Sequence, residues 1–247
     1  MYILAIETTG PYASVALMDA KAKIVASLTS KEEMNHLKEL MPMVDELLAK
    51  AKVDKSELTA IAASVGPGSY TGIRIGVSTA RALAQSLDIP CVPVKTLNAF
   101  IYQEKASGII CPIINARRGQ VYGALFDRGE YNCRTLLAPG PYMLEDVLKA
   151  IEEKAFGKVT FYGDGIDAYE EEIKKAIKAD RREFADKKIR YQSAESVAQD
   201  AFMKVLWKKT VKYDELEPEY MRETEAEQKL KDGTLEKERK AKMERMN

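Results

Sequence analysis

The chain has 247 residues, which suits one large domain or two small ones, and its 46% hydrophobic and 31% charged content is typical of a globular protein. Lys plus Arg and Asp plus Glu both number 38, so composition does not mark the whole surface as a nucleic-acid binder. The sequence has no apolar run of membrane-spanning length. Three widely spaced cysteines indicate reduced thiols in a cytoplasmic protein and no zinc site.

The first hundred residues alternate between strand and helix patterns. Apolar residues at helical spacing predict a helix that starts near Met34 and contains Pro42, where it either kinks or begins late. A second helix is predicted from Gly72, with Thr71 as its N-cap, and Pro90 ends it. Short apolar runs predict strands at residues 2–6, 13–18, 24–29, 60–65 and 91–94. The predicted order is therefore β-β-β-α-β-α-β.

The second half repeats this opening in eroded form. With a shift of 108 residues, Glu7 falls on Asn115 and Asp19 falls on Asp127. A strand at residues 159–162 then leads into a glycine turn at 163–165 and a helix at about 168–178. This echoes the strand, glycine-rich turn and helix of the first half, so the shared order predicts a duplicated fold.

The same patterns predict how the chain is divided. Residues 1–100 form a first lobe and residues 101–205 a smaller second lobe. A final helix, capped by Ser193, is predicted from about residue 194 to residue 208. A return segment, 206–229, is expected to pack on the body, with an extended stretch set by Pro218. Residues 230–247 form a charged tail, predicted to be disordered or a frayed helix.

A glycine-rich turn at residues 66–68 separates a buried strand from a helix, an arrangement that suits an anion at the helix terminus. It matches neither the Rossmann nor the Walker spacing. Within the helix, small residues recur every four positions, at Gly72, Gly76, Ala80 and Ala84. A glycine inside a helix costs about 1 kcal/mol relative to alanine. The residues alone leave two explanations equally open, packing on this domain's own sheet or contact with another subunit.

Few residues offer catalytic chemistry. Glu7, Thr8 and Thr9 follow the first strand, where an acidic residue and two hydroxyls could orient phosphate and magnesium, and Asn115 takes the corresponding place in the second half. A neutral amide is a poor magnesium ligand or general base, so these turns are interpreted as vestigial. His36 is the only histidine, and a structural or capping role is favoured for it over a catalytic one.

Five motifs in this order resemble the bacterial TsaB family, also called YeaZ. They are Ile3 to Thr8, Asn35-His36 with Leu40-Met41-Pro42, residues 66–76, Asn115 to Tyr122 and Pro218 to Arg222. The resemblance runs from Met1 to about Lys229. The family usually has aspartate at the position of Asn115.

This resemblance implies a duplicated actin-like fold of the ASKHA, ribonuclease H-like type, with two lobes that each hold a mixed five-stranded sheet flanked by helices. It implies a part in making tRNA threonylcarbamoyladenosine as the dimerisation partner of the catalytic subunit TsaD, with the ATPase TsaE binding the pair. No cofactor is then required by this chain, and ATP or ADP would bind at the assembly. This chain would contact tRNA only through the complex, and it would form a homodimer on its own. No contact with a membrane is expected.

The resemblance also implies which residues meet the partner. In TsaD a His-x-x-x-His metal motif follows the glycine-rich helix, and here that place runs from Thr96 to Phe100, so a non-catalytic, metal-free homologue is expected. The contact would involve the first two helices of the first lobe. The residues assigned to it are Leu37, Leu40, Met41, Val44, Gly72, Gly76 and Ala80.

Two other functions compete with this interpretation. One is an actin-fold kinase or ATPase that acts alone, with Glu7, Thr8 and Asn115 around magnesium. The other, more remote, is a glycoprotease-like peptidase, although no nucleophile and base are paired in the sequence.

Overall fold

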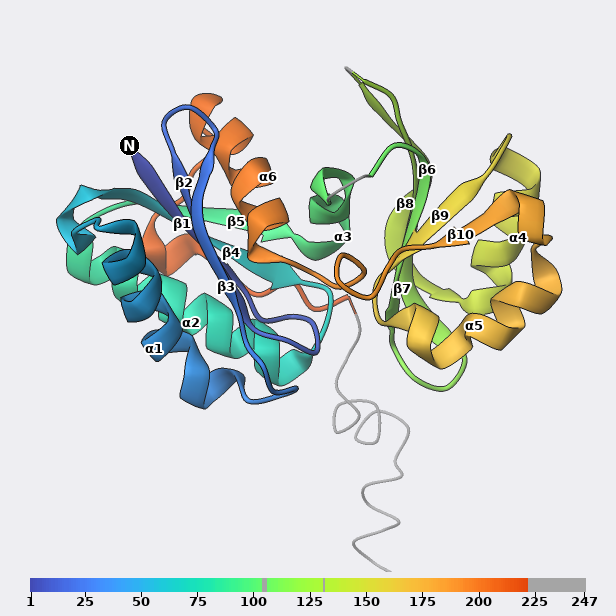
Figure 1. The fold of residues 1–247 in the computed structure, drawn as a ribbon, viewed down its shortest axis with the longest axis horizontal. Coiled ribbons are helices and arrows are strands. Elements are labelled where there is room, and N and C mark those ends of the chain that lie inside the picture. Colours follow the sequence, from blue (N-terminus) through green and yellow to red (C-terminus); the bar gives the residue numbers. More distant parts are fainter. Residues whose placement is uncertain (104–105, 131, 222–247) are drawn as a thin grey trace, which may run out of the picture.

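The computed structural model describes residues 1–103, 106–130 and 132–221, which form two lobes side by side, each built on a five-stranded sheet (Figure 1). The first sheet has the order β3-β2-β1-β4-β5. Its strands are β1 (Tyr2–Glu7), β2 (Ser14–Asp19), β3 (Ile24–Thr29), β4 (Leu58–Gly66) and β5 (Cys91–Lys95). In this sheet β1 runs antiparallel to β2 and parallel to β4.

The second sheet repeats this topology. Its order is β10-β9-β6-β7-β8, with β6 antiparallel to β7 and parallel to β9. Its strands are β6 (Gly108–Asn115), β7 (Gln120–Arg128), β8 (Cys133–Met143), β9 (Val159–Tyr162) and β10 (Arg182–Phe184). Glu7 closes β1 and Asn115 closes β6, as the shift of 108 residues predicts. The predicted duplication is confirmed.

Helices cover the sheets in layers. In the first lobe, α1 (His36–Ala51) and α2 (Tyr70–Leu87) pack on one face, and α6 (Ala194–Leu206) packs on the other (Figure 1). In the second lobe, α4 (Leu144–Lys154) and α5 (Gly165–Ala176) cover one face. The short α3 (Thr96–Ala99) starts the crossing between lobes, and Leu97 and Phe100 pack against the second sheet.

The position of α6 corrects the predicted boundary of the second lobe. Val197, Ala198 and Ala201 of α6 pack on Ile3 and Ala5 of β1. The helix therefore belongs to the first lobe, and the second lobe ends before residue 194. The apolar pattern of α6 shows that it has a buried face, but the sheet that covers this face is decided by tertiary structure.

Helices α1 and α2 of the first lobe start at His36 and Tyr70. Helix α1 is continuous from His36, with Pro42 inside it. Helix α2 begins at Tyr70 and its N-cap is Ser69, whose hydroxyl accepts from the Gly72 amide at 3.2 Å, so the prediction of Thr71 as the cap was wrong. Ser193 does cap α6, as predicted.

The return segment packs on the first lobe as far as it is described. Val211 pairs with Cys91 at the β5 edge, and Leu216 is fully buried in the core between the first sheet and α1 and α2. The Glu219 amide donates to the Val65 carbonyl at 2.7 Å. Residues 222–229 and the predicted charged tail lie outside the described residues. No helix in the described parts is long and apolar enough to cross a membrane.

Candidate functional site: the cleft between the lobes and the α1–α2 face

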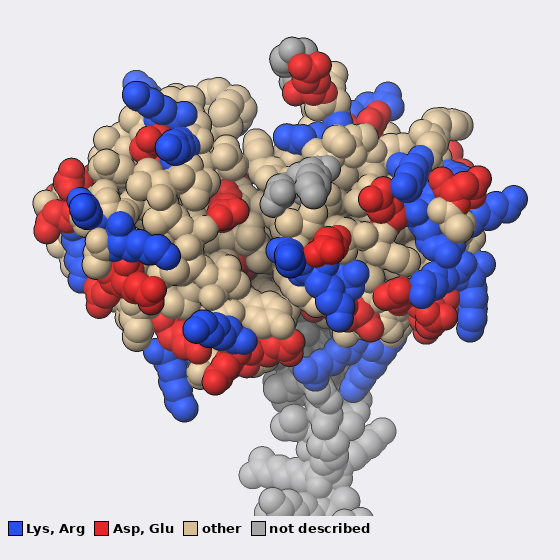
Figure 2. Space-filling view, viewed as in Figure 1, with Lys and Arg blue, Asp and Glu red and all other residues tan. Residues whose placement is uncertain are grey.

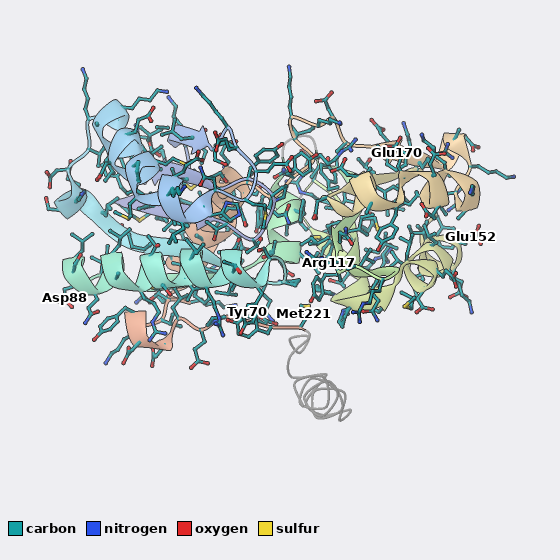
Figure 3. The ribbon with its side chains drawn as sticks, turned by 90° about the horizontal axis from the view of Figure 1, so that it is seen from below. Tyr70, Asp88, Arg117, Glu152, Glu170 and Met221 are labelled. Carbon is teal, nitrogen blue, oxygen red and sulfur yellow. The ribbon has the colours of Figure 1, made fainter. Side chains whose placement is uncertain are left out.

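A cleft of about 510 Å³ lies where the two equivalent first turns face each other. The first lobe contributes Thr9, Gly10 and the start of α2, and the second lobe contributes Asn115, Arg117 and Asp164. Seen from below, Tyr70 lies beside Met221 at the junction of the lobes, with Arg117 opposite on the second lobe (Figure 3). Acidic and basic side chains are interspersed over both lobes in the view of Figure 2.

Glu7 is fully buried and bonded within the first lobe. Its Oε1 accepts from the Thr9 amide at 2.5 Å and the Thr9 hydroxyl at 2.6 Å, and its Oε2 accepts from the Ser64 hydroxyl. Burial raises the pKa of this carboxyl, and the hydrogen bonds oppose that rise. Glu7 thus ties the end of β1 to β4, and neither carboxylate oxygen faces the cleft as a ligand.

Thr8 explains the small residues on α2. Its side chain is buried and donates to the Gly72 carbonyl at 2.7 Å. A Cβ at Gly72 would overlap the Thr8 carbonyl oxygen, and one at Gly76 would overlap the Thr8 hydroxyl. Ala80 is fully buried. The prediction that Gly72, Gly76 and Ala80 contact a partner was wrong, because this side of α2 faces the chain's own first turn and sheet.

The space beside the glycines of the glycine-rich loop is likewise filled by the chain's own backbone. A Cβ at Gly66 would overlap the Glu219 carbonyl, and one at Gly68 would lie 2.5 Å from the Thr9 carbonyl. The Ser69 amide donates to that Thr9 carbonyl at 2.8 Å. The glycines therefore admit the chain's own backbone, where a phosphate cradle would leave amides free for an anion.

On the second-lobe side of the cleft, the hydrogen-bonding capacity of the polar side chains is met less fully. The Asn115 side-chain oxygen accepts from the Arg117 amide at 2.8 Å, and Arg117 and Arg118 follow with φ of 64° and 54°. Asp164 lies across from this turn, and its Oδ1 is buried without a hydrogen-bond partner among the described residues. Burial raises the pKa of Asp164 to about 6.

His36 and the predicted metal position are both part of the packing. His36 is buried and its Nε2 donates to the Gly10 carbonyl at 3.0 Å, while burial lowers its pKa. The Thr96 hydroxyl meets that of Thr9 at 3.3 Å, and Phe100 is buried. Within the described ranges, no group of three His, Cys, Asp or Glu side chains could hold a metal. Free thiols are found at Cys91, Cys111 and Cys133.

The exposed face of α1 and α2 differs from the predicted contact set. Leu40 and Val44 are 1% exposed and belong to the core, so their assignment to a contact was wrong. Leu37 is 79% exposed and Met41 38%, one turn apart on the same side of α1. On α2 the outward stripe is Thr71, Ile75, Ser78 and Ala82, at helical spacing and exposed or half-buried.

Three residues that shape the cleft and the start of α2 were not predicted as site residues: Ser64, Asp164 and Tyr220. Ser64 lies 57 residues from Glu7 in the chain, and no local pattern pairs them. Asp164 stood in the predicted second glycine turn, which was the one available signal. Tyr220 of the return segment packs on Tyr70 with ring centroids 4.8 Å apart, and Arg74 lies over the Tyr70 ring.

The repeated sheets, with their first turns facing a cleft, define a two-lobed protein with the duplicated actin-like fold. A family model described as "TsaD: tRNA N6-adenosine threonylcarbamoyltransferase" matches residues 23–230. The TsaB protein of Buchnera aphidicola subsp. Schizaphis graminum is 32% identical over 79% of this chain and 90% of its own length. That of Bacillus subtilis is 37% identical over 62% of this chain and 67% of its own length.

The solved structure of YeaZ from Pseudomonas aeruginosa superposes with a TM-score of 0.73 and 25% identity, covering 89% of this chain and 99% of that one. The chain belongs to the TsaB (YeaZ) family, named for tRNA threonylcarbamoyladenosine biosynthesis.

Proposed function

We propose that this chain is a non-catalytic subunit of a tRNA threonylcarbamoyladenosine-forming complex, which binds TsaD through α1 and α2 and supports the association of TsaE. The observation that carries the proposal is the exposed α1–α2 face. Leu37 is 79% exposed, and large apolar side chains left in water at a helix surface favour burial against a partner.

The geometry of this face suits helix packing. A groove lined by Lys38, Glu39 and Pro42 separates α1 from β3, so Leu37 and Met41 lie on the opposite flank, toward α2. The outward stripe of α2 carries small side chains at Ser78 and Ala82, and small residues allow a second helix to approach closely. A four-helix contact of this kind would bury on the order of 800 Å² per partner. The same face would pair two copies of this chain when TsaD is absent.

The interior of the first lobe supports a scaffold role. Glu7, Thr8 and the glycine-rich loop fix the start of α2 through hydrogen bonds and backbone contacts. These are the groups that a stand-alone actin-fold kinase would present to magnesium and phosphate. We therefore place any bound ATP or ADP at the assembly with TsaD and TsaE, outside this chain's own cleft.

The test of the interface is co-purification with TsaD. The double variant Leu37→Glu/Ser78→Arg places charges on both helices of the exposed face, where burial in a contact would leave them unpaired. We expect it to fold normally by circular dichroism and to lose TsaD. Val25→Glu, on the exposed side of β3 in the same lobe, is the matched control and should retain TsaD. Retention of TsaD at wild-type stoichiometry by the double variant would rule out this face.

The test of the non-catalytic role uses the isolated chain. Calorimetric titration with ATP and magnesium should give no micromolar binding, and no ATP should be turned over. Binding with turnover by the isolated chain would favour the kinase alternative.

A further inference from the structure

The C-terminal end of α6 carries a basic and aromatic patch that the proposed interface does not use. We define the α6 patch as Leu206, Trp207, Lys208 and Lys209, four consecutive exposed residues. Leu206 is 56% exposed and Trp207, the only tryptophan of the chain, is 60% exposed. Helix α6 starts near the junction of the two lobes and ends at the top of the first lobe in the view of Figure 1.

The backbone holds this patch in a fixed shape. The Lys209 amide donates to the Lys204 carbonyl at 2.8 Å and the Lys208 amide to the Val205 carbonyl at 3.0 Å, which closes the helix in a Schellman motif. Lys208 has φ of 55°, a left-handed conformation that glycine adopts at lower cost. Just beyond the patch, Val211 exchanges two backbone hydrogen bonds of 2.9 Å with Cys91. The aromatic ring is thus carried on a backbone fixed on both sides.

The segment that carries the ring is purely basic. Residues 204–212 contain four lysines and no acidic residue. Lys204 pairs with Asp200 at 2.7 Å, while Lys208, Lys209 and Lys212 form no ion pair within the described part of the chain. The Lys209 ammonium lies 5.3 Å from the Trp207 ring centroid. Interaction with the helix dipole explains lysines at the end of a helix, but it does not explain why Leu206 and Trp207 are left in water.

We propose that the α6 patch binds RNA, with Trp207 stacking on an unpaired base while Lys208 and Lys209 contact the flanking phosphates. An exposed aromatic ring among unpaired cations is the combination that binds single-stranded nucleic acid. The inference rests on the proposed function, which brings this chain to tRNA, and it replaces the expectation that tRNA is met only through the complex.

RNA and TsaD could bind at the same time. The residues of β1 that face α6 are Ile3 and Ala5, whereas Leu4 and Ile6 face the core under α1 and α2. The α6 patch and the proposed TsaD contact therefore lie on opposite faces of the first sheet.

Because Trp207 is the only tryptophan of the chain, the intrinsic tryptophan fluorescence reports on the α6 patch alone. The full chain is titrated with an unmodified tRNA transcript while the intrinsic tryptophan fluorescence is followed, at several salt concentrations. We expect the fluorescence to be quenched on binding, because the base stacks on the indole. Lys208→Glu/Lys209→Glu should weaken binding at least tenfold and lower the salt slope by about 1.5. Trp207→Ala, followed by filter binding, should weaken it about tenfold, and Trp207→Phe should recover most of the loss.

Matched controls come from the second lobe. Lys187→Glu/Lys188→Glu removes another exposed lysine pair, and Phe156→Ala removes a ring that is 91% exposed. Both should leave tRNA binding unchanged. The proposal is overturned if tRNA does not quench the fluorescence, if the control pair weakens binding as much, or if only vesicles of anionic phospholipid quench it. Co-purification with TsaD is measured on every variant, so a failure of RNA binding is distinguished from a failure of the proposed subunit role.

Discussion

The two first turns of the molecule occupy equivalent places in the duplicated fold, but their polar groups have different partners. In the first lobe the Glu7 carboxylate accepts hydrogen bonds from Thr9 and Ser64, and Thr8 is locked against Gly72. In the second lobe, Asn115 bonds its own turn, and Asp164 keeps a buried oxygen without a partner among the described residues.

In both lobes, the glycines of these turns lie against a backbone carbonyl of the same lobe. Gly68 lies against the Thr9 carbonyl, and Gly163 and Gly165 lie against the Ile113 carbonyl. What differs is the side-chain network built on this shared backbone. In the first lobe that network anchors α2, the helix proposed to meet TsaD. The polar groups of the first-lobe turn are therefore bonded within the chain, whereas the second-lobe turn has a buried carboxylate oxygen without a partner among the described residues.

Gly72→Ala should have the largest effect, because the added methyl group would disrupt the close contact between α2 and the first turn. The new Cβ would overlap the Thr8 backbone oxygen, which cannot rotate away. We expect a loss of about 4 kcal/mol in the free energy of unfolding, measured by urea denaturation. A loss below about 1 kcal/mol would contradict the tight contact.

Gly76→Ala is the matched comparison for that variant. Its Cβ meets the Thr8 hydroxyl, which a side-chain change can remove. In a Thr8→Ala background the Gly76→Ala change should therefore become stabilising by about 1 kcal/mol, the helix propensity difference. Gly72→Ala should remain destabilising in the same background.

Glu7→Ala should have the next largest effect. It would leave the Thr9 amide and the Thr9 and Ser64 hydroxyls buried without an acceptor. We expect a loss of about 3 kcal/mol, measured by urea denaturation. Glu7→Gln keeps an acceptor and removes the buried charge, so it should cost less than about 1 kcal/mol at pH 7. Equal losses in the two variants would show that the hydrogen bonds do not hold this turn.

Much of the fold could be predicted from the sequence, because local patterns carry it. The strands at 24–29 and 159–162 match β3 and β9 residue for residue, and the register of Glu7 with Asn115 follows from the repeat. Helix α4 was not located, although Leu144, Val147, Leu148 and Ile151 have helical spacing.

The candidate site could be predicted only in part. The spacing of Gly72, Gly76 and Ala80 identifies one side of a helix, but it does not say whether that side faces inward. The partners that decide this, Thr8 for α2 and β1 for α6, are 64 or more residues away in the chain. The buried oxygen of Asp164 likewise depends on the packing of two turns that are distant in sequence.

Asp164→Asn tests the carboxylate of the second lobe whose Oδ1 is buried without a hydrogen-bond partner among the described residues. Burial raises the pKa of Asp164 to about 6 from a reference value of 3.8, so the folded protein binds a proton more tightly than the unfolded chain. The resulting stability is present below about pH 4 and is lost as the pH rises through about 6, by up to about 3 kcal/mol. At pH 7.5 we expect Asp164→Asn to be more stable than wild type by about 2 kcal/mol, with the advantage gone at pH 4.

The pH series separates the charge of Asp164 from its shape. Thermal unfolding of both proteins between pH 4 and 7.5 should show a smaller pH dependence in the variant. Parallel curves would mean that the carboxylate finds a partner in solution, and the contrast with Glu7 would disappear.

Arg117→Gly should have the smallest effect, because it relieves backbone strain at an exposed position of the second-lobe turn. Arg117 has φ of 64°, a left-handed conformation that costs a side-chain-bearing residue about 1 kcal/mol relative to glycine. The Asn115 oxygen accepts from the Arg117 backbone amide, which the substitution keeps. The greater freedom of glycine in the unfolded chain offsets part of this relief, so we expect a net gain of about 0.5 kcal/mol in the free energy of unfolding, measured by thermal unfolding. Gly119→Ala, two residues on with φ of 75°, should lose a similar amount. If both variants destabilise the protein, the Arg117 side chain stabilises this turn by more than its backbone conformation costs.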